Sequence, residues 1–197
     1  MLDLNVEITG RTPLLMHAFT DEAMASATEG TRAAVTGDKG TPREQAAASL
    51  YIGQDGHIVI PQPNLFRCII DAGKFFKAGK SKITTLKTSL IPSCLDMPAV
   101  EYLLAHDGWE VDSRPVRIPA TGGRIVRHRA RFDAWSLTFE AQLDTAVMSA
   151  KLLREIVDKA GAAIGLGDFR PDCKGPFGKF CVTRWVETPA AMAIAAE

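Results

Sequence analysis

The stretch that decides the fold is Gly161-Ala-Ala-Ile-Gly165-Leu-Gly167-Asp-Phe-Arg170-Pro-Asp-Cys-Lys174-Gly175-Pro-Phe-Gly178-Lys179-Phe180. Its five glycines allow closer backbone approach than a Cβ would permit. Exposed amides beside Arg170, Lys174 and Lys179 have the chemistry to hold phosphate. The stretch has no GK[ST] ending and follows a helix, so it is neither a Walker loop nor a dinucleotide fingerprint. A flexible connector is the alternative interpretation.

A helix is predicted before this stretch and a strand at its end. Ser149 is a favourable N-cap, and Gly165 is suited to end the helix in a left-handed conformation. One face of the helix carries Leu152, Leu153, Ile156, Val157, Ala160 and Ile164. Residues 177–186 predict the last strand of the chain.

The rest of the chain supplies the other elements of a small sheet. Alternating apolar and polar residues predict strands over residues 2–9, 109–118 and 135–143. Asp55-Gly56 predicts the turn of a hairpin over 51–60, and residues 64–79 predict an amphipathic helix whose later turns carry lysines. Prolines interrupt residues 83–104, which leaves room for short strands or a short helix.

The order of these elements predicts an α+β fold. Without the insertion described below, the order is strand, helix, strand, strand, helix, strand. This order is typical of a ferredoxin-like or RRM-like domain, in which an antiparallel sheet carries both helices on one face. The other face of the sheet is then free for a ligand.

Composition predicts one domain, because 197 residues with 46% apolar and 23% charged side chains are ordinary for a globular protein. We expect the domain to cover residues 1–188, with a flexible insertion at 17–50, a basic projection at 105–132 and a frayed tail at 189–197. No apolar run is long enough to span a bilayer, and the N-terminus does not resemble a signal peptide. We therefore expect a cytoplasmic protein with no membrane partner.

Cysteine spacing and charge exclude some site classes and favour another. The four cysteines form no CxxC pair, so disulfides and a zinc site are not expected, and no cofactor or metal is predicted. The formal net charge is zero. Basic residues are nevertheless concentrated in segments 67–87 and 114–131, and acidic residues in the N-terminal third and in 96–112. This distribution predicts a dipolar surface with one face that attracts phosphate.

The chain resembles the RAMP superfamily of CRISPR-associated RNA-binding proteins. The resemblance is strongest where a helix leads into Gly165-Leu-Gly167, then Arg170, then Gly175-Pro-Phe-Gly178 before the last strand. Thr12-Pro13-Leu14 after the first strand, Ile60-Pro61 before the first helix and Arg131-Phe132 before a central strand agree with it. In that family the glycine-rich loop touches guide RNA.

Within the superfamily the chain resembles the Cas-seven-type backbone subunit, or a solitary or phage-borne relative of it. The resemblance implies binding to single-stranded guide RNA, head-to-tail assembly of copies along that RNA, and contact with other effector-complex subunits. The insertion and the basic middle segment would correspond to the thumb-like or finger-like projections of such subunits. Basic side chains and amides would neutralise phosphates, and base pairing would supply specificity.

The residues expected to bind RNA come from the glycine-rich stretch, the first helix and the basic middle segment. They are Gly165, Gly167, Arg170, Lys174, Gly175, Gly178, Lys179, Arg67, Lys74, Arg124, Arg127, His128, Arg129 and Arg131. Phe169 and Phe177 are candidates for stacking on bases, with the hydrophobic core as the alternative.

Two other functions remain open from the sequence. Some backbone-type RAMP proteins cleave target RNA with an aspartate in the loop after the first strand, and Asp21, Glu22 and His17 lie in a comparable place. His128 is a candidate general base for RNA processing. The third hypothesis is a ferredoxin-like protein that binds a small phosphorylated ligand at the same glycine-rich loop. The non-catalytic function is favoured.

Overall fold

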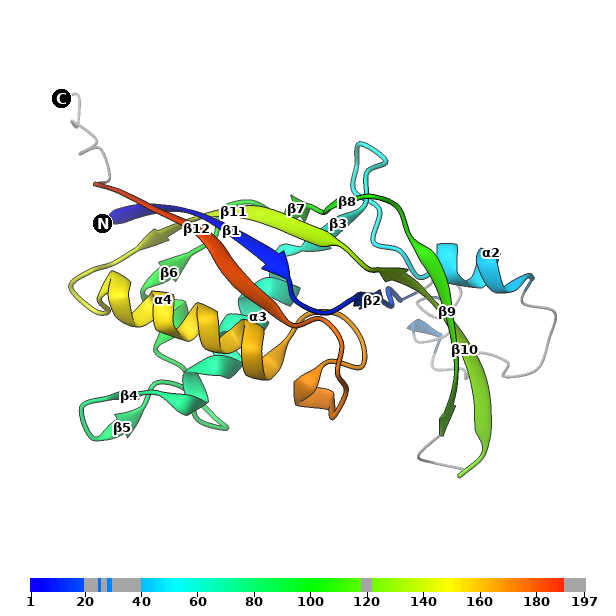
Figure 1. The fold of residues 1–197 in the computed structure, drawn as a ribbon. Helices are drawn as coiled ribbons and strands as arrows, with labels where there is room; N and C mark the ends of the chain where they lie inside the picture. The colour runs from blue at the N-terminus through cyan, green and yellow to red at the C-terminus, as the bar shows by residue number, and fades with distance from the viewer. Residues whose placement is uncertain (20–24, 26–27, 30–39, 118–121, 190–197) are drawn as a thin grey trace.

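The structure is a computed structural model that describes residues 1–19, 25, 28–29, 40–117 and 122–189. Its main sheet has β1 (Leu2–Gly10) at the centre, between β11 (Trp135–Leu143) and β12 (Phe180–Pro189). Both pairings are antiparallel, and a bulge shifts the β1–β12 register between Glu7 and Ile8. The last, first and third strands of a ferredoxin-like domain lie in this order, so the predicted α+β class is confirmed (Figure 1).

The second strand of the sheet is in short pieces. β6 (Leu95–Asp96) and β8 (Ala105–His106) pair with the outer edge of β11. Between them, β7 (Glu101–Leu103) pairs with β3 (Val59–Pro61). This second strand comes from the region that prolines interrupt, which explains why no single strand is predicted there.

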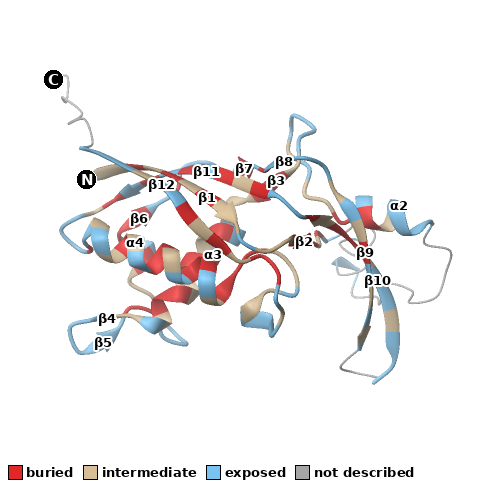
Figure 2. Cartoon of the chain, in the orientation of Figure 1, coloured by how far each residue is buried: buried red, intermediate tan, exposed pale blue. Residues whose placement is uncertain are grey.

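The two main helices lie on one face of the sheet (Figures 1 and 2). α4 (Ala150–Lys159) begins as predicted at Ser149, whose Oγ accepts a hydrogen bond of 3.3 Å from the Leu152 amide. It continues into a π-helical turn, Ala160–Ile164, and ends at Gly165, where φ is 77°.

The other main helix, α3 (Gln62–Ala72), is shorter than predicted. A 3₁₀ turn at Gly73–Phe75 ends it, and Phe76 is extended. The chain then forms a hairpin of β4 (Lys77–Ala78) and β5 (Ser81–Lys82). The prediction that the later turns of the helix carry lysines is therefore wrong, because Lys74 lies in the 3₁₀ turn and Lys77 in this hairpin.

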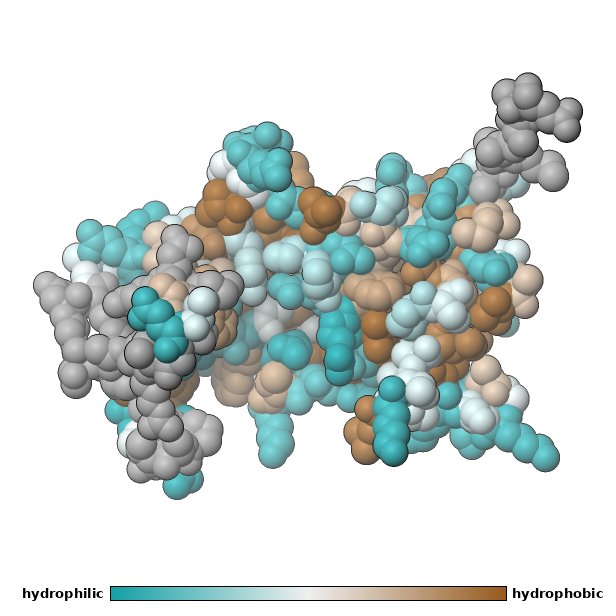
Figure 3. All heavy atoms as spheres, turned by 180° about the vertical axis from the view of Figure 1, so that it is seen from behind, coloured by the Kyte–Doolittle hydropathy of each residue, from teal (hydrophilic) through white to brown (hydrophobic). Residues whose placement is uncertain are grey.

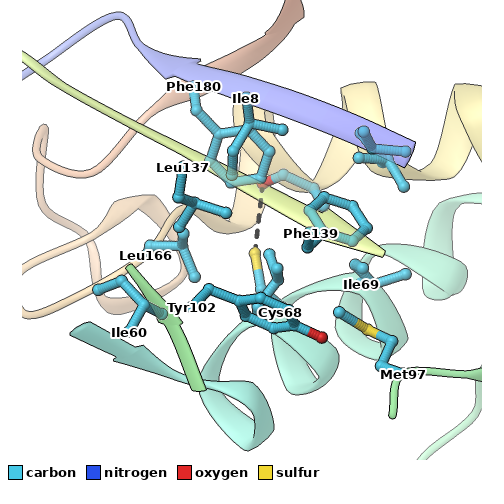
Figure 4. Packing of buried hydrophobic residues seen from close by; sticks show 14 of the residues in the cluster. Ile8, Ile60, Cys68, Ile69, Met97, Tyr102, Leu137, Phe139, Leu166 and Phe180 are labelled. Atoms are coloured by element: carbon cyan, nitrogen blue, oxygen red, sulfur yellow. Dashed lines mark hydrogen bonds between the residues drawn. The ribbon is translucent and has the colours of Figure 1, made fainter. Parts of the chain in front are cut away.

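The hydrophobic core fills the space between the helices and the inner face of the sheet (Figures 2 and 4). Its buried side chains include Val6, Ile8, Leu137, Phe139, Leu65, Ile69, Ile156 and Val157. Cys68 lies within it as a small hydrophobe and donates to the Ala160 carbonyl, with a sulfur–oxygen distance of 3.8 Å (Figure 4). Among the described residues no helix is both long and apolar enough to cross a bilayer.

A second, three-stranded sheet extends away from this body. It consists of β2 (Leu14–Met16), β10 (Arg124–Phe132) and β9 (Glu110–Arg117). β9 and β10 form a long hairpin whose far end is largely exposed (Figure 2). The strand predicted over 109–118 thus exists, but it pairs with β10 rather than joining the main sheet.

The predicted insertion at 17–50 contains α2 (Pro42–Ala47), which lies beside the β9–β10 hairpin (Figure 1). Thr41 and Glu44 form a capping box at its start. Most of residues 20–39, and the predicted tail beyond Pro189, lie outside the described residues. The predicted 51–60 hairpin is confirmed by an Ile52–Ile58 bridge and a positive φ of 75° at Gly56.

Candidate nucleic-acid interface

The glycine-rich loop, residues 165–179, has a conformation that only glycine permits at several positions. Gly165, Gly167 and Gly178 have φ angles of 77°, 73° and 68°. A Cβ at Gly167 would collide with the Leu15 carbonyl, and a Cβ at Gly178 with the Leu166 carbonyl. These glycines therefore allow the loop to pack against the protein's own backbone.

Hydrogen bonds fix the glycine-rich loop along its length. The Leu166 amide donates to the Gly178 carbonyl at 2.9 Å, and the Asp168 amide donates to the Leu15 carbonyl at 2.8 Å. The Gly178 amide donates to the Pro13 carbonyl, also at 2.8 Å. The loop is an ordered element built against β2 and the turn before it, rather than a flexible connector.

Most amides of the loop are consequently occupied within the protein. Within the described part of the chain, the amides of Gly167 and Arg170 are two that make no hydrogen bond. The glycine-rich sequence predicts exposed amides that could bind phosphate, whereas in the structure few loop amides are left without a hydrogen bond inside the protein. Any anion at the loop would therefore be held mainly by side chains.

Beside the loop lies a cleft of about 380 Å³ that collects basic residues from three distant parts of the chain. Arg170 reaches it from the loop, Arg67 from α3 and Arg127 from β10. The backbone of Gly165 and Gly167 forms part of its wall. The structure thus brings five of the predicted RNA-binding residues together.

The arginines of the cleft are held by specific partners. Arg170 donates from Nη1 to the Gly167 carbonyl at 3.1 Å, and Arg67 pairs with Asp71 at 2.9 Å. Arg127 contacts the ring of His17. The Arg67 side chain is 73% exposed, so its guanidinium has free donors for an anion.

Two aspartates, Asp71 and Asp168, line the same cleft. Asp168 is balanced by Arg129, whose guanidinium is 7% exposed and lies 2.6 Å from the carboxylate. Asp71 is balanced by Arg67. With both aspartates paired, Arg127 and Arg170 leave the cleft positively charged.

Strand alternation divides the predicted basic cluster on β10. The cross-strand neighbours of Arg127, Arg129 and Arg131 on β9 are Arg114, Asp112 and Glu110. The three arginines and their β9 neighbours lie on the face of the hairpin that meets the glycine-rich loop. Arg124 and His128 lie on the opposite face. Only Arg127 of the five lines the cleft.

The other predicted residues of the hairpin lie outside the cleft, and two of them bind polar side chains of the hairpin or its flank. Arg131 pairs with Glu110 at 2.7 Å and with Asp133 at 2.9 Å. His128 shares a hydrogen bond of 2.7 Å with the Ser113 hydroxyl. Arg124 lies opposite Arg117 near the hairpin end.

The other predicted residues lie around the loop but outside the cleft. Lys74 pairs with Asp172 at 2.7 Å. Lys174 is exposed with a positive φ of 62°, and the amide of Lys179 donates to the Thr12 hydroxyl. Gly175 and Gly178 form the base of the loop, where a Cβ would meet a carbonyl oxygen.

The two phenylalanines considered for stacking differ in exposure. Phe177 is buried beneath the Arg114 guanidinium, 4.7 Å from its ring centre, and Phe169 is 37% exposed. Their ring centres are 6.0 Å apart. Phe169 is the one with a ring accessible to a base.

The residues considered for catalysis are not brought together in the described structure. His17 lines the cleft, whereas His128 lies on the far face of the hairpin. Asp21 and Glu22 lie outside the described residues. Among the residues described, no three metal-ligating side chains form a group.

Several cleft residues were not predicted. Phe19, Tyr51 and Asn64 complete its wall. Asn64 lies in the first turn of α3 and Tyr51 at the start of the predicted hairpin, and neither position carries a sequence signal for binding. Their role follows from tertiary packing alone.

The open face of the main sheet is not the basic one. It carries Asp3, Glu7 and Glu140 on neighbouring strands, with Arg184 bound to Asn5 at 2.6 Å. The acids outnumber the arginine, so this face disfavours phosphate. The cleft, which lies beside the sheet rather than on it, is the better anion site.

No protein-family model matches the chain, and no curated protein matches it in sequence. Solved structures do match, among them a chain of the "Cryo-EM structure of the Type III-B Cmr-beta bound to cognate target RNA". That chain is 11% identical with a TM-score of 0.61, and the match covers 96% of this chain. Because it covers 61% of that chain, this chain spans less than two thirds of its length. The protein therefore shares the fold of a chain from the RNA-bound Type III-B Cmr-beta structure.

Proposed function

We propose that this protein binds single-stranded RNA by its phosphates, as a RAMP-like subunit of a CRISPR-type ribonucleoprotein. The observation that carries the proposal is the convergence of Arg67, Arg127 and Arg170 on one cleft beside the glycine-rich loop. These arginines come from three segments far apart in sequence. Charges scattered at random over the surface would not be expected to gather in one cleft in this way.

The chemistry of the cleft favours the RNA backbone over the bases. Guanidinium groups and the free Gly167 and Arg170 amides donate to phosphate oxygens without discriminating sequence. Three arginines would neutralise about three phosphates, which predicts a slope of about −2 for log K against log salt on a single strand. Base pairing of the bound RNA would then supply specificity.

The shared fold with a chain of an RNA-bound structure supports this proposal. Copies of the chain would assemble head to tail along the RNA, with other effector subunits at the ends. The β9–β10 hairpin extends away from the body (Figure 1), and in this proposal it contacts a neighbouring copy. Arg124 and Arg117 near its end would contact RNA there.

Filter binding with Arg170→Ala tests the proposal. We expect Kd to rise by about tenfold on every RNA sequence, because a charge-assisted contact to phosphate is lost. The salt slope should become shallower by about 0.7. Arg184→Gln, on the open face of the sheet, is the matched control and should leave Kd unchanged. Loss of binding to one sequence alone would contradict phosphate recognition.

Arg170 also supports the loop through Gly167, so Arg67→Gln serves as a second variant. Its side chain is 73% exposed, which makes a folding defect from this change small. An oligonucleotide length series separates polymer binding from a small phosphorylated ligand. Affinity that does not increase beyond a mononucleotide would favour the small ligand. Cleavage of labelled RNA in Mg²⁺ would favour the nuclease instead.

A further inference from the structure

A second hollow adjoins the cleft, on the side where α3 ends. This groove has a volume of about 1050 Å³. Its lining comprises Arg67, Asp71, Lys74, Phe75, Lys82, Thr84, Thr85, Leu86, Lys87, Thr88 and Asp172. Arg67 and Asp71 line both hollows, so the groove continues the cleft.

The groove carries a surplus of positive charge. Arg67 and Lys74 are paired with Asp71 and Asp172, at 2.9 Å and 2.7 Å. Lys82 and Lys87 also line the groove and form no ion pair with any described residue. The two paired cations are fixed in position, and the two unpaired lysines supply net charge for an anion.

An ordered turn forms the outer wall of the groove. The Thr85 amide donates to the Thr88 carbonyl at 2.8 Å, and the Thr85 hydroxyl accepts from the amides of Lys87 and Thr88 at 3.3 and 3.1 Å. Residues 86 and 87 therefore occupy the tip of a turn that is closed by several bonds. Leu86 at this tip is fully exposed.

The inner wall carries an exposed aromatic ring. Phe75 is 49% exposed, and the ammonium groups of Lys74 and Lys159 lie over its ring, with Nζ 5.4 and 4.9 Å from the ring centre. An aromatic ring beside basic groups is the usual arrangement for stacking a nucleic-acid base while its phosphate is neutralised. The apolar Leu86, which also lines the groove, offers a further apolar surface.

We propose that this groove binds an unpaired nucleotide of the RNA strand that leaves the cleft, with its base against Phe75 and its phosphate near Lys74 and Lys87. This inference rests on the proposed function, because the strand must first occupy the cleft. The base has to lie outside a duplex, since in a duplex the stacked neighbouring base pairs cover its faces. The groove would therefore make the end of the footprint specific for single strands.

The test measures RNA affinity as a function of length for wild type and Phe75→Ala. We expect Phe75→Ala to raise Kd roughly tenfold on RNAs long enough to reach the groove. RNAs that fill only the cleft should bind both proteins alike. Phe75→Leu keeps apolar packing without the aromatic face and should show an intermediate loss, which controls for a folding defect. Lys87→Gln should weaken the same long RNAs, and Arg184→Gln should not.

A photocrosslink gives an independent readout. A terminal 5-iodouridine should crosslink within residues 74–88, and annealing a complement over that terminus should abolish both the crosslink and the gain in affinity with length. If Phe75→Ala binds every length like wild type while Arg170→Ala is weakened, the groove proposal is overturned and the proposed function stands. If neither variant changes affinity, both are overturned. An equal effect of Phe75→Ala on all lengths would also overturn the groove proposal.

Discussion

The glycine-rich loop and the β9–β10 hairpin are both basic in sequence, but the fold uses their charges differently. The loop packs against β2, and its Arg170 faces the cleft. On the hairpin, Arg129 and Arg131 are bound by acids and only Arg127 reaches the cleft. A run of basic residues in sequence therefore overstates the charge available to a ligand. Strand alternation turns some of these side chains to the opposite face, and nearby carboxylates pair with others.

The two regions also meet at one ion pair, Arg129 with Asp168. This pair joins the body of the hairpin to the loop at the edge of the cleft. The glycines of the loop shape the wall of the cleft, and the hairpin contributes the charge of Arg127 to the same cleft. Substitutions can separate these two contributions.

The largest expected effect comes from Gly178→Ala, which tests whether the loop needs its shape. The new Cβ would meet the Leu166 carbonyl at a φ of 68°, so we expect the free energy of unfolding to fall by about 3 to 4 kcal/mol. Thermal denaturation should show a decrease in Tm of roughly 10 °C. Gly56→Ala has a similar φ of 75° with nothing within 4 Å of the added Cβ, and should cost about 1 kcal/mol. Equal losses would mean that close packing at the loop is unimportant.

The next effect concerns the junction between the two regions. Asp168→Asn leaves the Arg129 guanidinium, which is 7% exposed, without its anionic partner. We expect a loss of about 2 to 3 kcal/mol in chemical denaturation. Arg131→Met removes two ion pairs, with Glu110 and Asp133, whose carboxylates are 71% and 57% exposed, and should cost less than about 1 kcal/mol. A larger loss from Arg131→Met would reverse our ranking of the two pairs.

Two arginines of one strand test the division of the hairpin into faces. Arg127→Ala should weaken binding of a short single-stranded RNA about tenfold, because Arg127 lines the cleft. Arg124→Ala, on the opposite face, should change Kd by less than about twofold on the same RNA, which is too short to reach a neighbouring copy. Fluorescence anisotropy at fixed salt measures both. Similar losses would show that RNA follows the hairpin rather than the cleft.

The last prediction needs no substitution and compares the labelling rates of two thiols. Cys68 lies under the loop and donates to the Gly165 carbonyl at 3.3 Å, whereas Cys173 on the loop is exposed. Burial raises the pKa of the Cys68 thiol, which keeps it protonated and unreactive. A maleimide should therefore label Cys173 about a hundredfold faster or more. Comparable rates would show that the loop opens readily.

Sequence patterns predict the periodic parts of this fold well. The strand over 135–143, the helix that begins after Ser149 and its end at Gly165 all follow from local alternation, capping and glycine chemistry. The second strand of the main sheet does not, because its short pieces depend on partners elsewhere in the chain. For the same reason α3 ends earlier than its apolar pattern indicates.

The sequence predicts a basic site beside the glycine-rich loop, but it does not predict all of the residues that line the cleft. Arg67 and Arg170 follow from their positions beside helix and glycine signals, and the structure places both in the cleft. No local signal distinguishes Arg127 from Arg124, because which face of a strand meets the loop is decided by tertiary packing. Tyr51 and Asn64 join the wall for the same reason.

The π-helical turn at Ala160–Ile164 has a further consequence for how this chain tolerates length changes. A π turn holds one more residue than an α turn, and here the Gly165 amide reaches back five residues to the Ala160 carbonyl. Deleting one residue from it would restore α geometry and shorten the path that leads from α4 into the glycine-rich loop. The loop's register with β2 would be lost. The extra residue thus acts as a spacer, and a single-codon deletion here should be far less tolerated than one in the exposed 53–57 turn. That turn is a hydrophilic projection with apolar residues at its base (Figure 3).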